Sequence, residues 1–275
     1  MEEFNMLTKE QKEKIKQESK KIGDNISHIK HRIVVFSGKG GVGKTMVSVN
    51  LAYGLHLHGF KTGMLDADIT GPNVPKMTGI KGEVHTLNEK IIPQESKGVK
   101  IISMANLLPA NQAVIWRGPL RSKMINQFLG DVEWGGLDYL IADLPPGTGD
   151  ESLTITQSMK PDMAIVVTTP QEVSLIDSAR AIAMAKKMKI PHIALIENMS
   201  GLICPKCGQL IELFGTGGGK KQAEETGIEF LGSIPMNVNA RRLADEGKPF
   251  IMEDKKIDIS VAVFQAIQKM EQIIG

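Results

Sequence analysis

A glycine-rich segment constrains the fold of this chain more than any other feature. It reads Gly38-Lys39-Gly40-Gly41-Val42-Gly43-Lys44-Thr45 and has the spacing of a phosphate-binding P-loop. The apolar run Ile33–Phe36 precedes it, and apolar residues at helical spacing follow it. In such a loop the backbone N–H groups turn inward around a phosphate, Lys44 reaches the β- and γ-phosphate oxygens, and the Thr45 hydroxyl ligates Mg²⁺. The additional lysine, Lys39, suggests a further phosphate contact.

Apolar runs recur along the chain and predict an α/β fold with a doubly wound, mostly parallel sheet flanked by helices. Most runs are continuously apolar, as expected of parallel strands that helices cover on both faces. The expected strands are Ile33–Phe36, Thr62–Leu65, Val99–Met104, Tyr139–Ala142, Met163–Thr168, His192–Ile196 and Phe230–Ile234. Helical patterns lie between several of them, for example over Ser174–Met188. In a sheet of this kind, ligands bind at the carboxyl ends of the strands.

Length and composition favour one α/β domain preceded by a charged helical extension. The 275 residues can bury one substantial core, and no low-complexity linker divides them. Residues 1–30 are rich in Lys, Glu and Gln, so we expect a charged helix outside the main core, followed by the P-loop domain over residues 31–275. The interspersed glutamates favour a solvated helix over a basic tail for nucleic acid or lipid.

Charge and hydropathy bear on the partners and the compartment of the protein. The formal net charge of +2 is nearly balanced and no basic patch is conspicuous, so we expect no nucleic-acid partner. No apolar run approaches the roughly 18 residues of a transmembrane helix, so we expect no membrane association. The N-terminus is polar rather than signal-like, and two cysteines do not make a disulfide framework in a chain of this size. We therefore expect a cytoplasmic protein.

Two acidic segments each follow an expected strand. Asp143 ends a buried strand, where a carboxylate can hold Mg²⁺, and it leads into a Pro/Gly-rich loop whose Gly147 N–H could contact a γ-phosphate. Asp66 and Asp68 follow another strand, and side chains two apart on an extended segment point the same way. One of them could position an attacking water while the other supports the Mg²⁺ shell. The alternatives are a strand-ending turn and a surface Asx-turn.

Both cysteines of the chain lie in one Cys-x-x-Cys loop, Cys204-Pro205-Lys206-Cys207. Two thiols this close can share a metal or cycle as a dithiol. One pair supplies two thiolates, whereas tetrahedral zinc or a [4Fe–4S] cluster takes about four protein ligands. A two-fold axis that joins two such pairs would complete the site in a homodimer. Lys206 beside the thiols is expected to lower their pKa. A [4Fe–4S] cluster, zinc and a redox dithiol all remain open as interpretations.

Several separated motifs resemble those of a known family. The segment at 38–45 is similar to the deviant Walker A motif of the nitrogenase iron protein, ParA and MinD ATPases. Asp-Ala-Asp-Ile-Thr-Gly-Pro at 66–72 and Asp-Leu-Pro-Pro-Gly-Thr-Gly-Asp at 143–150 resemble the two switches of its Mrp/ApbC branch, the iron–sulfur cluster carrier ATPases. Trp116-Arg117-Gly118-Pro119 and Glu197-Asn198-Met199-Ser200 also resemble that branch. The resemblance covers the chain from about residue 30 to the C-terminus.

This resemblance implies a single-domain P-loop NTPase fold and a homodimeric ATPase. Such a protein binds and hydrolyses ATP with Mg²⁺ and transfers a [4Fe–4S] cluster, bridged between two subunits by Cys204 and Cys207, to apo iron–sulfur proteins. The resemblance also implies that Lys39 reaches across the dimer to the nucleotide of the partner subunit. Two unrelated features, this lysine and the cysteine pair, therefore predict the same symmetry.

The resemblance further assigns individual roles at the nucleotide site. Asp68 matches the switch-I aspartate tied to hydrolysis, so Lys39, Lys44 and Asp68 are the expected catalytic residues. Asp143 matches the Walker B position and is expected to hold Mg²⁺ with Thr45. Asn198 matches the residue that hydrogen-bonds adenine, for which an amide offers both a donor and an acceptor. The rival functions are a partitioning or positioning ATPase of the ParA/MinD type and a zinc-stapled nucleotide-binding scaffold.

Overall fold

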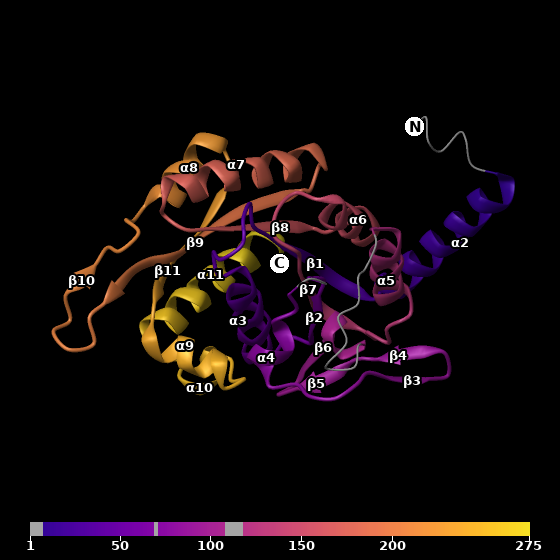
Figure 1. Ribbon diagram of the computed structural model, residues 1–275, viewed down its shortest axis with the longest axis horizontal. Coiled ribbons are helices and arrows are strands. Elements are labelled where there is room, and N and C mark those ends of the chain that lie inside the picture. The colour runs from indigo at the N-terminus through magenta and orange to yellow at the C-terminus, as the bar shows by residue number, and fades with distance from the viewer. Residues whose placement is uncertain (1–7, 69–70, 108–117) are drawn as a thin grey trace.

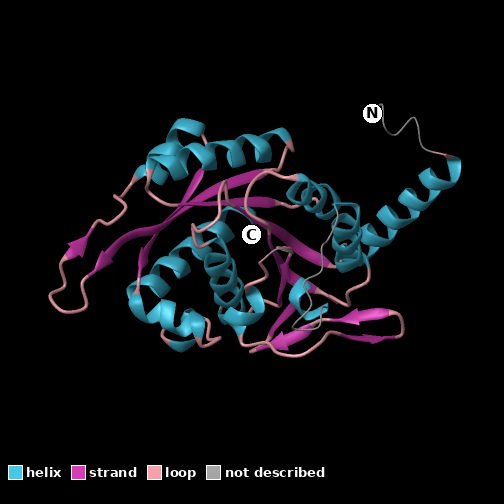
Figure 2. Ribbon diagram, viewed as in Figure 1, coloured by secondary structure: helices cyan, strands magenta, loops and turns pink. Residues whose placement is uncertain are grey.

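The chain folds into a central sheet with helices on both faces, and the computed structural model describes residues 8–68, 71–107 and 118–275 (Figures 1 and 2). The strands are β1 (Ile29–Phe36), β2 (Thr62–Asp66), β3 (His85–Leu87), β4 (Lys90–Ile92), β5 (Gln94–Ser96), β6 (Val99–Ser103), β7 (Leu137–Asp143), β8 (Met163–Thr168), β9 (His192–Ile203), β10 (Leu210–Ile211) and β11 (Glu229–Met236). The helices are α2 (Lys9–Ile26), α3 (Lys44–Leu57), α4 (Val74–Thr78), α5 (Gly118–Gly130), α6 (Asp150–Met159), α7 (Glu172–Lys187), α8 (Gly218–Thr226), α9 (Val238–Asp245), α10 (Phe250–Glu253) and α11 (Asp258–Ile274).

The order of the strands confirms the predicted doubly wound, mostly parallel sheet. In the nine-stranded sheet of the described residues the order is β10-β9-β8-β1-β7-β2-β6-β5, and β11 pairs with β9. Antiparallel pairs join β10 to β9 and β5 to β6, while β1 pairs in parallel with both β7 and β8. Ligands of doubly wound sheets bind beyond the carboxyl ends of the strands where the strand order reverses, and the P-loop follows the central strand β1 there.

Strand β1 shows why the core strands are apolar without alternation. Ile33 and Val35 point to a core shared with α3 and α11, whereas Val34 and Phe36 point to a second core shared with α5, α6 and α7. All four side chains are fully buried. Because successive side chains of a strand face opposite sides, a sheet covered on both faces needs apolar residues at every position.

The strand boundaries agree with the sequence prediction where the sequence is continuously apolar. The prediction of Met163–Thr168 coincides with β8. Strand β9 is longer than the expected His192–Ile196 and continues to Ile203, directly before the first cysteine. The short strands β3, β4, β5 and β10 were not predicted, because they pair in exposed or half-buried antiparallel hairpins that need no apolar run. Among the described residues, no helix is both long enough and apolar enough to cross a membrane.

Helix α2 corrects the expectation that the N-terminal helix lies outside the main core. Its first half projects away from the molecule (Figure 1), but its last turn joins the core. Ile22 and Ile26 are buried together with Leu129 of α5. Asn25 Nδ2 donates to the carbonyl oxygens of Leu129 (2.8 Å) and Val132 (2.9 Å). The division into residues 1–30 and 31–275 stays a prediction, and the last turn of α2 packs with the domain that follows it.

We expect Ile22→Ala to destabilise the whole protein by about 2–5 kcal/mol, since it leaves a cavity between α2 and the core. Ile15→Ala is the matched control, because Ile15 lies on the same helix with 41% of its surface exposed. Its effect is expected to stay within about 0.5 kcal/mol. Urea unfolding followed by circular dichroism measures both free energies. Equal effects of the two substitutions would mean that α2 does not belong to the cooperative unit.

Candidate functional site

The P-loop connects the end of β1 to the start of α3. Gly43 is the N-cap of α3 with φ 81°, and Lys44 is the first helical residue. A Cβ on Gly43 would overlap the Asn198 amide, and a Cβ on Gly38 would overlap the backbone of Asp177 in α7. Glycine is therefore required at both positions by close neighbours, as well as by the left-handed backbone of Gly43. The unpaired N–H groups of the first turn of α3 make this end of the helix suitable for a phosphate.

A buried carboxylate, Asp143, organises the centre of the site. It is fully buried at the end of β7 and accepts hydrogen bonds from Thr45 Oγ1 at 2.7 Å and Ser48 Oγ at 2.6 Å. Lys44 Nζ lies 2.7 Å from Asp143 Oδ1 as an ion pair. Among the described residues Nζ has no well-aligned hydrogen-bond acceptor, so its N–H groups are available to phosphate oxygens. Ser48 was not anticipated from the sequence.

The pair Thr45 and Asp143 fits a magnesium ion. The Thr45 hydroxyl donates a hydrogen bond to the carboxylate, which leaves the lone pairs of Thr45 Oγ1 for a cation. Hydroxyl and carboxylate oxygens are the ligands that Mg²⁺ prefers. The structure thus brings the two expected metal residues into direct contact although 98 positions separate them in the chain.

Of the two acidic residues at the end of β2, Asp66 lies inside the protein and Asp68 lies at a cavity beside the P-loop. Asp66 is fully buried and accepts from Ser103 Oγ (2.8 Å) and from the Asp68 backbone N–H (3.2 Å). Burial and then the negative charge of Asp143 raise the pKa of Asp66 to about 7, while these two hydrogen bonds and the Lys44 charge act in the opposite direction. The two carboxylates therefore have different environments.

Asp68 lines a cavity of about 210 Å³ together with the P-loop residues from Lys39 to Thr45. Its Oδ1 accepts the Gly71 backbone N–H at 3.1 Å. The structure thus places Asp68 and Lys39 at the same cavity, as the sequence analysis expected of two catalytic residues. Ile69 and Thr70 of the same motif lie outside the described residues, as do Trp116 and Arg117 of the Trp-Arg-Gly-Pro motif.

The loop after β7 differs from the expectation in one contact. Gly147, with φ 90°, donates its N–H to the Ser37 carbonyl oxygen at 2.9 Å. The N–H is therefore engaged with the start of the P-loop in this structure. A direct bond from Gly147 to a γ-phosphate requires this backbone bond to open first.

Asn198 lies between the P-loop and an apolar cavity of about 440 Å³. Its Nδ2 donates to the Val42 carbonyl oxygen at 2.8 Å, and its buried Oδ1 has no hydrogen-bond partner among the described residues. The cavity is lined mainly by apolar side chains, among them Met46, Met77, Met199, Leu202, Pro235 and Met236. An unpaired acceptor at the edge of an apolar cavity suits a flat ring that carries an amino group. The methionines of this cavity come from separate segments of the chain, so no periodic pattern in the sequence predicts that they line one cavity.

The two cysteines lie in a tight hairpin between β9 and β10. The hairpin projects from one end of the molecule, opposite to α2 (Figure 1). Cys204 N–H donates to the Gln209 carbonyl (2.9 Å), and Gly208 N–H donates to the Cys204 carbonyl (2.9 Å). Both thiols are free, and Cys207 is exposed. Among the described residues, no group of three or more His, Cys, Asp or Glu side chains is placed to hold a metal.

The Cys204 thiol lies against backbone N–H groups of its own turn. Its pKa is lowered chiefly by the Cys207 backbone N–H, then by the Lys206 backbone N–H and the Cys207 thiol. The contribution of Lys206 to this lowered pKa is a hydrogen bond from its backbone N–H. A turn that directs its N–H groups at a sulfur stabilises the thiolate by hydrogen bonding.

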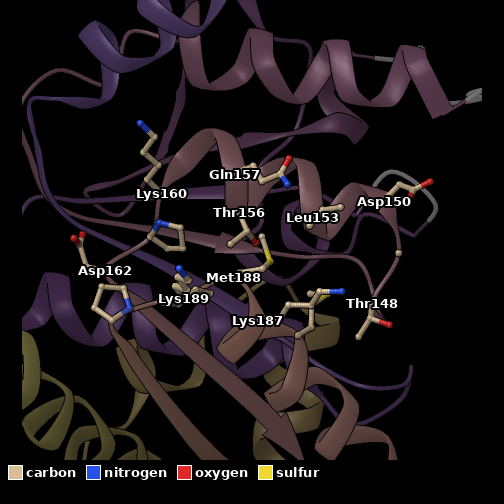
Figure 3. Close-up of a pocket in the computed structure, with 15 residues that line it drawn as sticks. Thr148, Asp150, Leu153, Thr156, Gln157, Lys160, Asp162, Lys187, Met188 and Lys189 are labelled. Carbon is tan, nitrogen blue, oxygen red and sulfur yellow. The ribbon is translucent and has the colours of Figure 1, made fainter. Parts of the chain in front are cut away.

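A larger cavity lies away from these residues, between α6 and α7 (Figure 3). It holds about 820 Å³, and Thr148 and Asp150 lie at one end of the view, with Lys160 and Asp162 at the other. No P-loop residue lines it. Cavity volume therefore does not identify the nucleotide site of this protein, whereas the convergence of polar groups on Asp143 does.

Comparisons with known proteins agree with this site. The family model described as ParA, NUBPL iron-transfer P-loop NTPase matches residues 28–271, and the chain belongs to this family. An iron-sulfur cluster carrier protein of Methanocaldococcus jannaschii is 51% identical over 267 residues, which cover 94% of this chain and 92% of that protein. An iron-sulfur cluster carrier protein of Pyrococcus horikoshii is 52% identical over 235 residues, which cover 81% of this chain and 80% of that protein.

Two solved structures extend the comparison. A nucleotide-binding protein in complex with ADP from Archaeoglobus fulgidus is 40% identical with a TM-score of 0.77, and the match covers 87% of this chain and 94% of that chain. The MinD cell division protein of Aquifex aeolicus is 22% identical with a TM-score of 0.64 over 88% of this chain and 97% of that chain. The likeness to MinD shows the P-loop NTPase fold alone.

We expect Cys204 to react with iodoacetamide at a pH below the ordinary pKa of a free cysteine, because the lowered pKa leaves more thiolate. The pH profile of the rate is measured in a Cys207→Ser protein, which keeps the amide of residue 207. Adding Lys206→Ala should leave the midpoint of that profile unchanged. A midpoint that rises toward the free-cysteine value in the Lys206→Ala protein would restore the ammonium group as the cause.

Proposed function

We propose that this protein is an ATP-dependent iron–sulfur cluster carrier that passes a [4Fe–4S] cluster to apo iron–sulfur proteins. One observation carries the proposal: a chain with a P-loop lysine, hydroxyl and carboxylate in mutual contact also presents its two cysteines as free thiols on a projecting hairpin. The relatives at 51% and 52% identity named iron-sulfur cluster carrier proteins support it. Nucleotide hydrolysis would supply the energy, and the thiols would hold the cargo.

At the nucleotide site each residue has a role in binding or orientation. Lys44 leaves its ion pair with Asp143 to neutralise the phosphates, together with Lys39 and the N–H groups of α3. Thr45 and Asp143 would hold Mg²⁺, which supplies positive charge to the phosphate oxygens when bound. Asp68, at the rim of the same cavity, orients the attacking water.

The base of the nucleotide would lie in the apolar cavity beside Asn198. The amino group of adenine would donate to the unpaired Asn198 Oδ1, whose burial makes an unsatisfied acceptor costly. The methionine side chains would pack against the faces of the ring. Guanine presents a carbonyl oxygen where adenine has its amino group, so this acceptor favours ATP.

The cargo site is proposed to be shared by two subunits. A [4Fe–4S] cluster takes about four thiolates, and each chain has two cysteines, so a two-fold axis through the hairpins would complete the ligands. Lys39 lines the P-loop cavity and would reach the nucleotide of the partner subunit. Both contacts use the same axis. We propose a cytoplasmic homodimer that has apo iron–sulfur proteins, rather than nucleic acid or membranes, as partners.

The two rival functions are distinguished from the carrier by their consequences. A partitioning or positioning ATPase would bind DNA or lipid and would not need the cysteines. The likeness to MinD concerns the fold and does not favour that function. A zinc-stapled scaffold would use the same thiols, because thiolates do not discriminate sharply between zinc and iron. The bound metal therefore decides between scaffold and carrier.

Anaerobic reconstitution with iron and sulfide tests the proposal. We expect a brown protein with the broad visible absorption of an iron–sulfur cluster and about four iron atoms per two chains. The Cys204→Ala/Cys207→Ala protein should show neither colour nor iron. Size-exclusion chromatography with light scattering should find the loaded protein as a dimer. A colourless protein that retains zinc, or a loaded single subunit, would contradict the carrier.

The coupling of hydrolysis to transfer is tested with Asp68→Ala. We expect this protein to load the cluster like the wild type but to transfer it to an apo-protein at least about 10-fold more slowly, because a water left unoriented costs that much or more. Lys44→Ala should behave in the same way. Asp24→Ala, an exposed aspartate on α2, is the control and should transfer normally. If Asp68→Ala transferred the cluster at the wild-type rate, transfer would not depend on hydrolysis, and the proposed coupling would be wrong.

A further inference from the structure

A second buried carboxylate, Glu197 on β9, has no part in the chemistry described above. It is fully buried and accepts four hydrogen bonds. Oε1 accepts from Ser200 Oγ at 2.6 Å, Gly217 N–H at 3.0 Å and Ser233 Oγ at 3.3 Å, and Oε2 accepts from Gly219 N–H at 2.6 Å. Burying a carboxylate without such bonds costs several kcal/mol, and here three donors on Oε1 and one on Oε2 compensate for the lost hydration.

The glycine tract after the cysteines is built around this carboxylate. A glycine-rich run such as residues 215–219 is typical of a flexible loop, but Gly217 is the N-cap of α8 and Gly219 lies in its first turn. A Cβ on Gly219 would lie 2.9 Å from the Cβ of Glu197, and a Cβ on Gly218 would lie 2.7 Å from Leu175 Cδ1. The glycines allow the helix end to approach β9 closely. The positive end of α8 is thus occupied by a carboxylate of the chain itself.

Glu197 therefore holds both ends of the cysteine hairpin. Ser200 stands before the hairpin, Gly217 stands after it, and Cys204 and Cys207 lie between them. A single side chain thereby fixes where the hairpin leaves the sheet and where it returns. A change in its position moves both ends together.

The next residue along β9 contacts the nucleotide loop. Asn198 Nδ2 donates to the Val42 carbonyl oxygen of the P-loop at 2.8 Å. Successive residues of a strand point to opposite faces, so the Glu197 side chain reaches α8 while that of Asn198 reaches the P-loop. The two contacts are joined by one peptide unit of β9, whose parallel pairing with β8 and β11 holds it in register.

We propose that Glu197 is a positioning residue that couples occupancy of the P-loop to the geometry of the cysteine hairpin. This inference rests on the proposed binding of the nucleotide base by Asn198. A base that seats against Asn198 fixes the adjoining peptide unit, and the carboxylate carries that constraint to Ser200, Gly217 and Gly219. The thiols then respond to nucleotide without any contact between nucleotide and hairpin.

Alkylation of the apo-protein thiols by iodoacetamide tests the coupling. The rate is measured under anaerobic conditions with and without Mg·ADP, which fills the P-loop and the base cavity but lacks the γ-phosphate that Lys39 of a partner would contact. We expect Mg·ADP to change the wild-type rate by about fivefold, within the range of ordinary allosteric couplings. In E197Q the side-chain amide places an N–H donor opposite the N–H groups of Gly217 or Gly219, so the hydrogen bonds are lost. The rates with and without Mg·ADP should then differ by less than about twofold.

A matched substitution on the hairpin itself provides the control. Glu212 is exposed, and among the described residues its carboxylate accepts only the Thr216 hydroxyl, at 3.1 Å. E212Q makes the same chemical change and should keep the wild-type ratio. A purely structural role of Glu197 would alter the alkylation rate equally with and without Mg·ADP. The ratio therefore isolates the coupling from simple loosening of the hairpin.

The outcomes decide the proposal even if E197Q does not fold. S200A removes one of the four hydrogen bonds and should give a ratio between those of the wild type and E197Q. A ratio of one in the wild-type protein overturns the coupling. The wild-type ratio in an E197Q protein that folds and binds ADP also overturns it, and so does the wild-type ratio in S200A. Because the measurement uses no iron, it fails independently of the proposed cluster transfer, which the reconstitution tests.

Discussion

The contacts of the buried Asp143 carboxylate with the first turns of α3 are the interaction on which the P-loop site depends. The carboxylate is fully removed from solvent, and its charge is compensated by Lys44, Thr45 and Ser48 from the first turns of α3. Removing one partner of such a buried pair costs about 3–5 kcal/mol, since the other charge stays desolvated. The same groups that stabilise the unliganded protein are those that phosphate and Mg²⁺ would take over. Binding of phosphate and Mg²⁺ would therefore exchange the partners of one buried carboxylate.

The two-faced sheet explains how this carboxylate comes to lie there. Strands β1 and β7 pair in parallel, with Val35 opposite Asp143, so that the P-loop and the acidic strand end emerge at the same edge. Helices pack on both faces of the sheet, and Asp143 is fully buried at that edge. Asp66, opposite Asp143 on the neighbouring strand, is buried by the same arrangement, and its pKa is raised to about 7. The proximity of two carboxylates follows directly from the strand register.

The cysteine hairpin, unlike the P-loop site, lies mostly outside the core. It projects from the sheet, and its apolar residues Ile203, Leu210 and Leu213 are substantially exposed. What anchors it is Glu197, one residue away from Asn198. A hairpin fixed at its base and open at its tip can present two thiols to a second molecule while its orientation stays defined by the core. The cysteine hairpin and the P-loop thus both contact a single strand, β9.

Local patterns in the sequence were sufficient for the parts of the protein that are contiguous in the chain. The P-loop, the apolar parallel strands and the Cys-x-x-Cys pair follow from spacing and residue type, because backbone turns and thiol chemistry act over a few residues. Roles inferred for Lys39, Asp68 and Asn198 still rest on resemblance and on their places at the two cavities.

Contacts between distant segments were decided only by the tertiary structure. Ser48 meets Asp143 across 95 positions and Ser103 meets Asp66 across 37, and neither pairing leaves a periodic trace in the sequence. The hydrogen bonds from Gly217 and Gly219 to Glu197 likewise leave no local pattern in the sequence. Only the folded turn places the backbone N–H groups of Cys207 and Lys206 against the Cys204 sulfur. Residue types determine which groups are available, whereas burial and strand register determine which of them meet.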